Sequence, residues 1–333
     1  MNNLRFGFVG CGRHAKANIY PSVKLAGIKL TSICAKHIEN ASTVAQQYGN
    51  ATPYDDYHKM LSKENLDAVF VVLPETMQSS VVIDCLNAGA HVFVEKPLGL
   101  NASEAAAVAN ASAKTGKKVM VGFMKRYAPA YLEMKRFMND HNAFGDVLSL
   151  TGMFVARSFG TEEFFIKNAA IHYVDIIRFI LGDIKIVKGF SNSRGEVIDT
   201  TFSFEYDNGC IGNMFFAGAP SWARHNEELL VTGINGFVKV ENMRRVIAHN
   251  AAKDYKPPVP RWQLMDEEDR IITSIDTSSS GGWKDLYLNG YAGEIQNFVD
   301  CITNNLELNP SAADNVKTMQ FCDDIIKAIQ RID

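Results

Sequence analysis

The sequence predicts an α/β domain built on a parallel sheet, followed by an α+β domain with a mainly antiparallel open sheet. Three observations predict this fold class: the length, a regular strand–helix alternation in the first half, and a run of consecutive strands in the second. The 333 residues are enough for two domains of roughly 100–200 residues each. We expect the domains to span residues 1–122 and 123–333.

The first half alternates short apolar runs with segments of helical spacing. The runs rich in Val, Ile and Phe, predicted to be strands, are residues 4–9, 28–34, 68–73, 91–94 and 118–121. The predicted helices between them are residues 14–25, 40–48, 76–88 and 102–114. Gly89 and Gly116 follow the last two helices as C-caps would. Alternating strands and helices imply a parallel sheet covered on both faces.

The second half is arranged differently. The predicted helices are residues 129–139, 168–181, 291–303 and 312–332, and the predicted loops are residues 256–260 and 278–282. Residues 183–250 are mostly strand-like, with Asn-Gly turns at 207–209 and 234–236. An Asn-Gly step between apolar runs is a strong hairpin signal. Consecutive strands without helices between them predict an antiparallel sheet.

The composition narrows the class of protein. Hydrophobic residues make up 47% and charged residues 21% of the chain, an ordinary globular balance. A net charge of −3 gives no electrostatic basis for a nucleic-acid partner. No stretch approaches the roughly 20 apolar residues of a membrane span, and the first residues do not resemble a signal peptide. The six cysteines show no CxxC spacing, so we expect no metal site and a reducing, cytoplasmic setting.

A glycine-rich turn follows the first predicted strand. The sequence from Gly10 to Ala15 matches G-x-G-x-x-G/A. Gly10 would form the tight turn, Gly12 would let a pyrophosphate approach the backbone, and Ala15 would let helix and strand pack closely. The helix N-terminus would offer N–H groups to the phosphates. The strand, turn and helix occur in the order that a Rossmann-type dinucleotide-binding domain requires. A turn that contains glycines by chance is the alternative.

The next question is which dinucleotide the turn would bind. An NAD site usually has Asp or Glu about 20 residues later, where it binds the ribose 2′-hydroxyl. Here Lys36 and His37 occupy that place, Arg13 lies in the glycine turn, and no acid precedes Glu39. Cations there suit a 2′-phosphate, so we expect NADP to be preferred. The alternative is that Lys36 and His37 are surface residues and that either cofactor binds.

Four segments together resemble one known family. They are the glycine turn, Leu73-Pro74, the Val-Phe-Val-Glu-Lys-Pro sequence at 92–97, and the Lys-Arg-Tyr-Ala-Pro-Ala-Tyr sequence at 125–131. This set resembles the Gfo/Idh/MocA family of NAD(P)-dependent enzymes, which act mostly on sugars, cyclitols and related polyols. The resemblance covers nearly the whole chain, and the Glu-Lys-Pro segment is its most specific mark.

The resemblance implies that Lys96 lies near the nicotinamide and a substrate hydroxyl. Physical reasoning agrees, because a residue at the carboxyl end of a parallel strand points into the ligand crevice. A cation there can stabilise negative charge on a substrate oxygen. Taken alone, a lysine before a proline is more often a surface charge. The cofactor contacts expected from the turn and the resemblance are Gly10, Cys11, Gly12, Arg13, His14, Lys36, His37, Leu73, Pro74, Glu95 and Lys96.

A second family mark lies on a predicted helix, where the family has a Gly-x-His-x-x-Asp pattern and an Asp four residues before its His. Here Asn168 and His172 are four residues apart on one helix face, and Asp175 follows His172 by three. His172 can act as a general base or acid near neutral pH. The alternative is a hydrogen-bonded histidine on an amphipathic helix. The expected substrate contacts are Lys96, Arg126, Tyr127, Asn168 and His172, with Lys96, His172 and Asn168 as the catalytic set.

The chain departs from the family pattern at a few positions. Asn168 replaces the usual Asp, so it can hold a hydroxyl but cannot take its proton, which leaves the base role to His172. Ala170 stands where Gly is usual, Leu73 replaces a Thr, and Gln78 stands where many members have His. Other aromatic and cationic residues of a kind that suits a sugar site, to which we assign no role, are Arg157, Phe159, Trp222, Arg224, Trp283 and Tyr287.

These residues predict an NAD(P)-dependent oxidoreductase that interconverts a secondary alcohol and a ketone on a sugar, cyclitol or related polyol. One alternative is a non-catalytic nucleotide-binding sensor on the same fold, against which the retention of Lys96 and His172 argues. Another is redox-neutral glycoside cleavage with bound NAD. The resemblance also implies homodimers or homotetramers formed through the sheet of the second domain.

Overall fold

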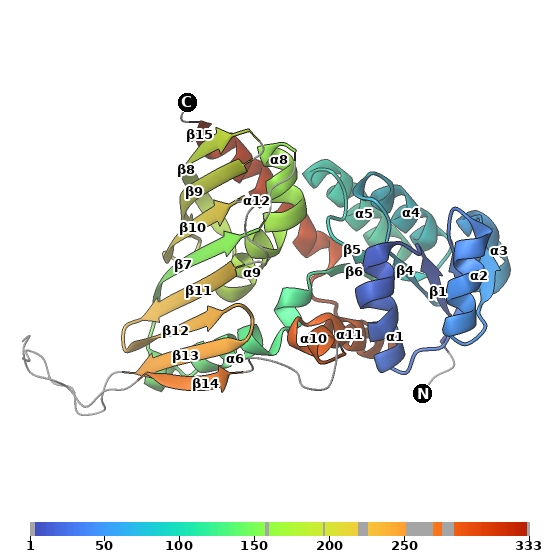
Figure 1. The fold of residues 1–333 in the computed structure, drawn as a ribbon, viewed down its shortest axis with the longest axis horizontal. Coiled ribbons are helices and arrows are strands. Elements are labelled where there is room, and N and C mark those ends of the chain that lie inside the picture. Colours follow the sequence, from blue (N-terminus) through green and yellow to red (C-terminus); the bar gives the residue numbers. More distant parts are fainter. Residues whose placement is uncertain are drawn as a thin grey trace, which may run out of the picture. The chain divides into compact units, whose positions relative to one another are not determined.

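The chain folds into two compact units, which we describe separately. The computed structural model describes residues 4–156, 160–195, 197–218, 226–250, 269–274 and 283–331 (Figure 1). The first unit joins Met1–Tyr127 to Gly290–Asp323, and the second joins Ala128–Asn289 to Asp324–Asp333. The predicted boundary at residue 122 therefore lies five residues before the observed one. The sequence prediction also missed the return of residues 290–323 to the first unit.

A six-stranded parallel sheet forms the centre of the first unit. Its strands are β1 (Phe6–Val9), β2 (Leu30–Cys34), β3 (Thr52–Tyr54), β4 (Ala68–Val71), β5 (His91–Glu95) and β6 (Val119–Gly122). They lie in the order β3-β2-β1-β4-β5-β6. The order reverses between β1 and β4, and a crevice for ligands opens at the carboxyl ends of the strands at such a point. The Rossmann-type fold predicted from the sequence is confirmed.

Helices follow these strands in turn. They are η1 (Ala15–Ile19), a π-helical segment, α1 (Tyr20–Leu25), α2 (Ile38–Gln47), α3 (Tyr57–Glu64), α4 (Glu75–Asn87) and α5 (Ala102–Thr115). The sequence prediction missed β3 and α3. β3 has only three residues, one of them proline, which is typical of an edge strand. The carboxylate of Asp56, a standard N-cap residue, accepts hydrogen bonds from the backbone of the first turn of α3.

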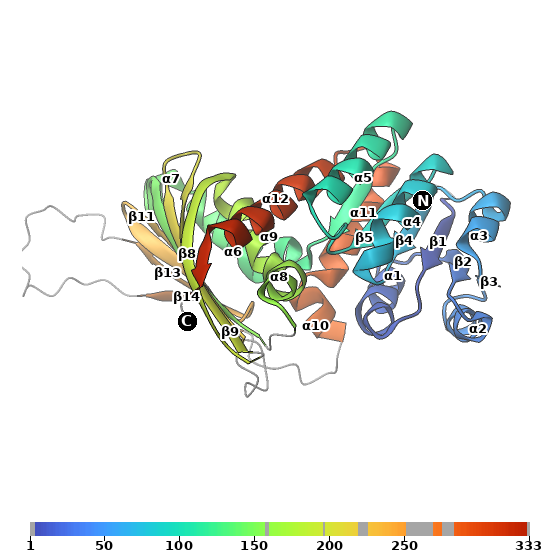
Figure 2. The same cartoon turned by 90° about the horizontal axis from the view of Figure 1, so that it is seen from above.

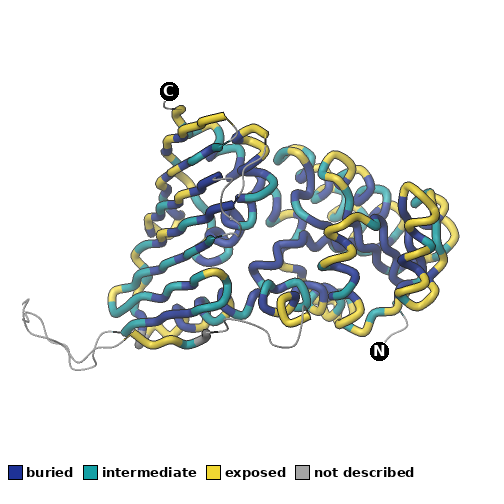
Figure 3. The backbone as a smooth tube through the Cα atoms, in the orientation of Figure 1, coloured by how far each residue is buried: buried dark blue, intermediate teal, exposed yellow. Residues whose placement is uncertain are grey.

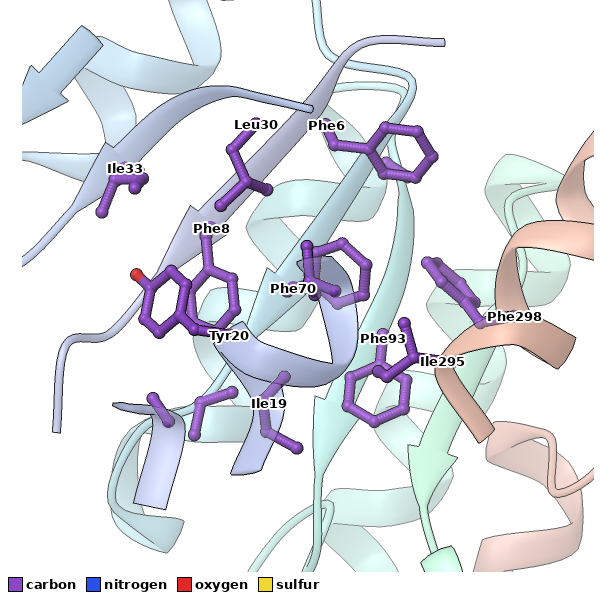
Figure 4. Packing of buried hydrophobic residues seen from close by; sticks show 14 of the residues in the cluster. Phe6, Phe8, Ile19, Tyr20, Leu30, Ile33, Phe70, Phe93, Ile295 and Phe298 are labelled. Carbon is purple, nitrogen blue, oxygen red and sulfur yellow. The ribbon is translucent and has the colours of Figure 1, made fainter. Parts of the chain in front are cut away.

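Aromatic side chains fill the core of the first unit. Phe8 on β1 stacks on Tyr20 at 3.8 Å between ring centroids, and Phe70 on β4 lies beside Phe93 on β5 (Figure 4). Helix α11 (Tyr291–Thr303) adds Phe298, whose ring packs edge-on against both Phe70 and Phe93. A helix from the far end of the sequence therefore completes this core.

A nine-stranded sheet forms the second unit. Its strands are β7 (Val147–Val155), β8 (Ile184–Arg194), β9 (Val197–Tyr206), β10 (Ile211–Ala217), β11 (Asn226–Gly233), β12 (Gly236–Glu241), β13 (Arg245–Asn250), β14 (Arg270–Ser274) and β15 (Ile329–Arg331). Their order is β14-β13-β12-β11-β7-β10-β9-β8-β15. Antiparallel hairpins join β9 to β10 and β11 to β12, where the Asn-Gly turns predict them. The pairs β7–β10 and β8–β15 are parallel, so the sheet is mixed but mainly antiparallel.

The remaining helices are η2 (Met124–Tyr127), α6 (Pro129–Met138), α7 (His141–Phe144), α8 (Glu162–Phe165), η3 (Ile166–Ala170), α9 (Ile171–Leu181), α10 (Trp283–Leu288) and α12 (Ala312–Ala328). Within the second unit, α6 and α9 lie on one face of the nine-stranded sheet (Figure 2). Buried and exposed positions alternate along its strands, as in β9 and β10 (Figure 3). The sheet therefore has a packed face and an open face.

Two predicted helix ends were wrong. The helix predicted to begin at residue 168 begins at Glu162, where Thr161 caps the first turn. The last helix ends at Ala328 rather than at residue 332, because the chain continues as β15 beside β8. The loops predicted at 256–260 and 278–282 lie outside the described residues. Within the described part of the chain, no helix is long and apolar enough to cross a membrane.

Candidate active site

The glycine turn between β1 and the first helix has two glycines with different surroundings. Gly10 has a φ of +116°, and a Cβ on it would lie 2.0 Å from the carbonyl oxygen of Val72. A Cβ on Gly12 would meet no atom within 4 Å, and its φ lies outside the left-handed region. Gly10 is therefore required by the fold, whereas Gly12 leaves open space above the backbone. This is the space that a pyrophosphate needs to approach the turn.

A pocket of about 850 Å³ opens beside this turn. Its walls come from the carboxyl ends of β1, β2 and β4 and from the start of α4. The lining residues that the sequence predicts as cofactor contacts are Gly10, Cys11, Gly12, Lys36, His37, Leu73 and Pro74. The structure therefore brings together residues spread over more than sixty positions of sequence. The volume lies within the range of small-molecule and cofactor sites, so the pocket and the open side of Gly12 fit a dinucleotide.

The far end of the pocket contains charges of both signs. Lys36 and His37 are exposed after β2, as predicted. Asp55 and Asp56, which follow β3, also line the pocket, and the sequence analysis missed them because it did not predict β3. The Asp56 Oδ1 atom accepts hydrogen bonds from the backbone N–H of His58 at 2.9 Å and of Lys59 at 3.4 Å. Asp55 is exposed.

Lys96 follows β5 at the carboxyl edge of the parallel sheet. Its backbone N–H donates to Oε2 of Glu95 at 3.2 Å. The amide Nε2 of the buried Gln78 donates to the carbonyl oxygen of Pro97 at 2.7 Å. Burial lowers the pKa of Lys96, and the carboxylates of Glu95 and Glu75 oppose that shift. Hydrogen bonds on both sides therefore fix the backbone that carries this cation.

The side chain of Glu95 forms a hydrogen bond with that of His14, which lies in the glycine turn. The His14 Nε2 atom lies 3.0 Å from Oε1 of Glu95, which is buried. The Nδ1 atom of the same ring lies 3.1 Å from the amide nitrogen of Asn18. Because an amide nitrogen only donates, Nδ1 accepts and the proton lies on Nε2. The residues that line the pocket do not include His14, Glu95 or Arg13, and Arg13 is exposed.

Asn168 and His172 lie in the second unit, on the continuous helical run of α8, η3 and α9. Asn168 lies within η3, a π-helical segment, and its side-chain amide donates to the carbonyl oxygen of Phe164 at 3.2 Å. Both Asn168 and His172 are half-buried. π-Helical turns inside α-helices are frequent at functional sites. The two residues share a helix, as predicted, and Asp175 one turn later is buried.

A buried hydrogen-bonded group supports this helix. The hydroxyl of Tyr173, next to His172, lies 2.9 Å from that of Tyr131 on α6. The Tyr131 hydroxyl also donates to Oε1 of the buried Glu227 on β11 at 3.3 Å. Two helices and the sheet are thus tied together beside His172, so the orientation of α9 is well defined.

Arg126 and Tyr127 were predicted to bind substrate, and the structure gives them another role. Arg126 is buried and forms an ion pair with Asp314 at 2.6 Å and a hydrogen bond to the Asn309 side chain at 2.5 Å. The Tyr127 hydroxyl donates to the side chain of Asn297 at 2.8 Å and to the carbonyl oxygen of Asn309. Both side chains anchor the returning residues 290–323, and their contact with substrate stays a prediction.

The remaining candidates add little to the site. Arg157, Phe159, Trp222 and Arg224 lie outside the described residues. Trp283 and Tyr287 are exposed on α10. We assign none of these residues to the site.

Comparisons with known proteins agree with this geometry. Residues 4–123 match the model of an oxidoreductase family with an NAD-binding Rossmann fold, Gfo/Idh/MocA. An inositol 2-dehydrogenase from Klebsiella pneumoniae is 25% identical over 98% of this chain and 94% of its own length. The scyllo-inositol 2-dehydrogenase (NAD(+)) of Bacillus subtilis is 27% identical over 91% of this chain and 87% of its own length. A 3-ketoreductase from Actinomadura kijaniata, solved with NADP and TDP-benzene, has a TM-score of 0.77 at 17% identity over 99% of both chains.

Proposed function

Since this chain belongs to the Gfo/Idh/MocA family of oxidoreductases, we propose that it interconverts a secondary alcohol and a ketone on a cyclitol, sugar or related polyol. The observation that carries this proposal is Lys96. It follows the strand next to β4, and residues just after β4 line the dinucleotide pocket. Its backbone is held by Glu95 and Gln78. A cation fixed at this edge of a dinucleotide-binding sheet suits an alcohol–ketone site.

The three predicted catalytic residues would each have a separate task. When bound, NAD(P) supplies the hydride acceptor or donor. His172 takes the hydroxyl proton during oxidation and returns it during reduction. Lys96 stabilises the negative charge that develops on the substrate oxygen. Asn168 holds the hydroxyl in place, because an amide can donate and accept hydrogen bonds but cannot take the proton.

The cofactor would be held by the first unit alone. Gly12 admits the pyrophosphate, and Leu73 and Pro74 form the wall after β4. Lys36 and His37 support a preference for NADP, because both are exposed at the far end of the pocket. Asp56 competes less with them, since its carboxylate already caps α3. Measured dissociation constants decide the preference, and tighter binding of NAD than of NADP would contradict it.

Lys96→Met tests the chemical assignment. The variant removes the cation but keeps a side chain of similar length, so the cofactor should bind as in the wild type. We expect kcat to fall by about two orders of magnitude or more, the usual cost of losing an electrostatic catalyst. Steady-state kinetics with a cyclitol substrate and fluorescence titration of the cofactor measure the two effects. Full turnover by Lys96→Met, with cofactor affinity retained, would refute the assignment.

The open face of the nine-stranded sheet supports a homodimer or homotetramer. Ile186, Phe190, Ile211 and Phe215 are exposed on β8 and β10. The register aligns Ile186 and Ile211 on either side of Glu205, and Phe190 and Phe215 on either side of Thr201. Exposed apolar side chains gathered on one sheet face, with polar side chains of β9 between them, support an interface there. We propose a second copy of this chain as the partner.

A further inference from the structure

One buried carboxylic acid of the first unit has no part in the chemistry described above. Glu294 lies in the first turn of α11, one turn before the core residue Phe298. Its side chain is fully buried, and neither carboxyl oxygen has a hydrogen-bond partner among the described residues. An ionised carboxylate without a partner is very costly to bury, and such a group instead takes up a proton.

Glu95 is the acid whose negative charge affects the pKa of Glu294. Burial, and then the negative charge of Glu95, raise the pKa of Glu294 well above its ordinary range. Glu95 has the opposite surroundings, because its two oxygens accept hydrogen bonds from His14 and from the backbone of Lys96. Glu95 therefore has two hydrogen-bond donors, whereas Glu294 has none among the described residues.

A glycine on the neighbouring strand leaves room for the Glu95 side chain. Glu95 pairs with Gly122 of β6, and a Cβ on Gly122 would lie 3.3 Å from the Glu95 carboxyl group. Tyr291 lies on the same helix turn as Glu294, and its ring packs edge-on against that of His14 at 5.9 Å. Burial first, and then the charges of Glu95 and Glu294, raise the pKa of Tyr291.

Other titratable groups lie on the elements that pack against α11. Those on η2 are Lys125, Arg126 and Tyr127, and those on η1 and α1 are Lys16, Tyr20 and Lys24. Arg126 is paired with Asp314, and the Tyr20 hydroxyl donates to the carbonyl oxygen of Gly10 at 3.1 Å. None of these groups contributes to the raised pKa of Glu294, whose causes are burial and then the charge of Glu95 on β5.

We propose that Glu294 is a positioning residue for Lys96, and that it holds the one proton of a buried Glu294–Glu95 pair. The pair then carries a single negative charge, which favours the Lys96 ammonium, and Glu95 keeps its hydrogen bonds to His14 and to the Lys96 backbone. Loss of the Glu294 proton at high pH adds a second buried negative charge, which repels Glu95 and weakens those bonds. The effect on catalysis rests on the function proposed for Lys96, whereas the protonation of Glu294 does not.

Thermal unfolding as a function of pH tests the proton. The folded-state pKa of Glu294 is raised above its unfolded value of about 4.3. The folded wild type therefore binds the extra proton above that pH and loses stability as the pH rises. Glu294→Gln keeps the neutral shape and escapes this loss. We expect the Tm of the variant minus that of the wild type to be near zero at about pH 4 and to grow steadily toward alkaline pH.

Glu307→Gln is the matched control, because Glu307 is an exposed glutamate of the same unit. Its Tm difference from the wild type should not grow with pH. Equal pH dependence for Glu294→Gln and Glu307→Gln would overturn the proposal. If Glu294→Gln does not fold, infrared spectra of the wild type decide the question. The carbonyl stretch of a protonated carboxylic acid should persist at neutral pH, and its absence would refute the buried proton.

The pH profile of kcat tests the link to Lys96. In the wild type we expect an alkaline limb that includes the ionisation of Glu294, and in Glu294→Gln this limb should move to higher pH. Identical alkaline limbs would contradict the positioning role, even where the unfolding data support the buried proton. If no polyol is turned over by the wild type, the proposed function fails. The unfolding and infrared data then still decide the protonation of Glu294.

Discussion

Gly10 and Gly12 are two residues apart in one turn, but the fold requires glycine only at position 10. At position 12 we expect the bound cofactor to require it. Gly10 is fixed by backbone conformation and by contact with Val72, and both belong to the fold. Gly12 has neither constraint, so its missing side chain matters only when a ligand is bound. Substitutions at the two positions can therefore test the stability of the fold and the affinity for the cofactor independently.

Alanine substitutions at the two glycines should therefore have opposite signatures. Gly12→Ala should change the free energy of unfolding by less than about 1 kcal/mol. It should weaken cofactor binding by about tenfold or more, which corresponds to about 1.4 kcal/mol. Gly10→Ala should cost more than about 2 kcal/mol of stability, because a positive φ and a backbone clash are combined. Denaturant unfolding and cofactor titration measure both. Undiminished cofactor affinity in Gly12→Ala would show that the pyrophosphate does not lie there.

At the residue scale, the sequence predicts the parts of the site that belong to local motifs. The pocket contains Gly10, Gly12, Lys36 and His37, as the glycine turn and the end of the second strand indicate. Asp55 could not be placed without β3, whose three residues include a proline. Glu294 carries no local signal, because its burial depends on a helix packing against a sheet more than 170 residues earlier in the chain. The contacts of Arg126 with Asp314 and of Tyr127 with Asn297 could not be predicted for the same reason, since these partners are also distant in sequence.

At the element scale, α11 belongs to the first unit although it lies more than 160 residues after that unit's sheet in the sequence. Ile295 and Phe298 project from α11 toward Phe93 on β5 (Figure 4). The helical periodicity of residues 291–303 predicts the helix and its apolar face, but it does not identify the sheet that this face covers. The predicted start of the helix that carries His172 was six residues too late for a local reason. This helix contains the π-helical segment η3, which shifts the apolar spacing out of register.

Phe298→Ala measures how much α11 contributes to the first unit. The side chain is fully buried among aromatic rings, so its loss should cost about 3–5 kcal/mol of unfolding free energy. Gln296→Ala, at an exposed position of the same helix, should change stability by less than about 0.5 kcal/mol. Chemical denaturation followed by fluorescence compares the two variants. A cost below about 1 kcal/mol for Phe298→Ala would mean that α11 is not part of this core.

At the scale of the whole molecule, the open face of the nine-stranded sheet is the surface through which we propose that copies of the chain associate. Ile211, which is 62% exposed, is the first residue of β10, the strand next to the central strand β7. Ile211→Glu should shift the sedimentation of the protein toward the monomer, because a buried charge opposes association. Leu25→Glu replaces an exposed apolar residue of the first unit and should leave the association state unchanged. A wild-type chain that sediments as a monomer at all concentrations would contradict the proposed oligomer.

The whole molecule also explains why the two-unit division could be only partly predicted. The change from alternating elements to consecutive strands places a boundary near residue 122, close to the observed one after Tyr127. The chain then crosses back at Gly290 and again after Asp323. Those crossings depend on tertiary contacts such as the ion pair between Arg126 and Asp314, and no composition or spacing marks them.

Turnover by the wild-type protein tests the central claim most directly. Inositols, sugars and sugar nucleotides should be screened with NADP and NAD in parallel, following the nicotinamide absorbance. We predict that at least one cyclitol or sugar is oxidised at a secondary hydroxyl and that the rate is higher with NADP. A protein that binds the dinucleotide but turns over none of these substrates with either cofactor would contradict the claim and favour a nucleotide-binding sensor.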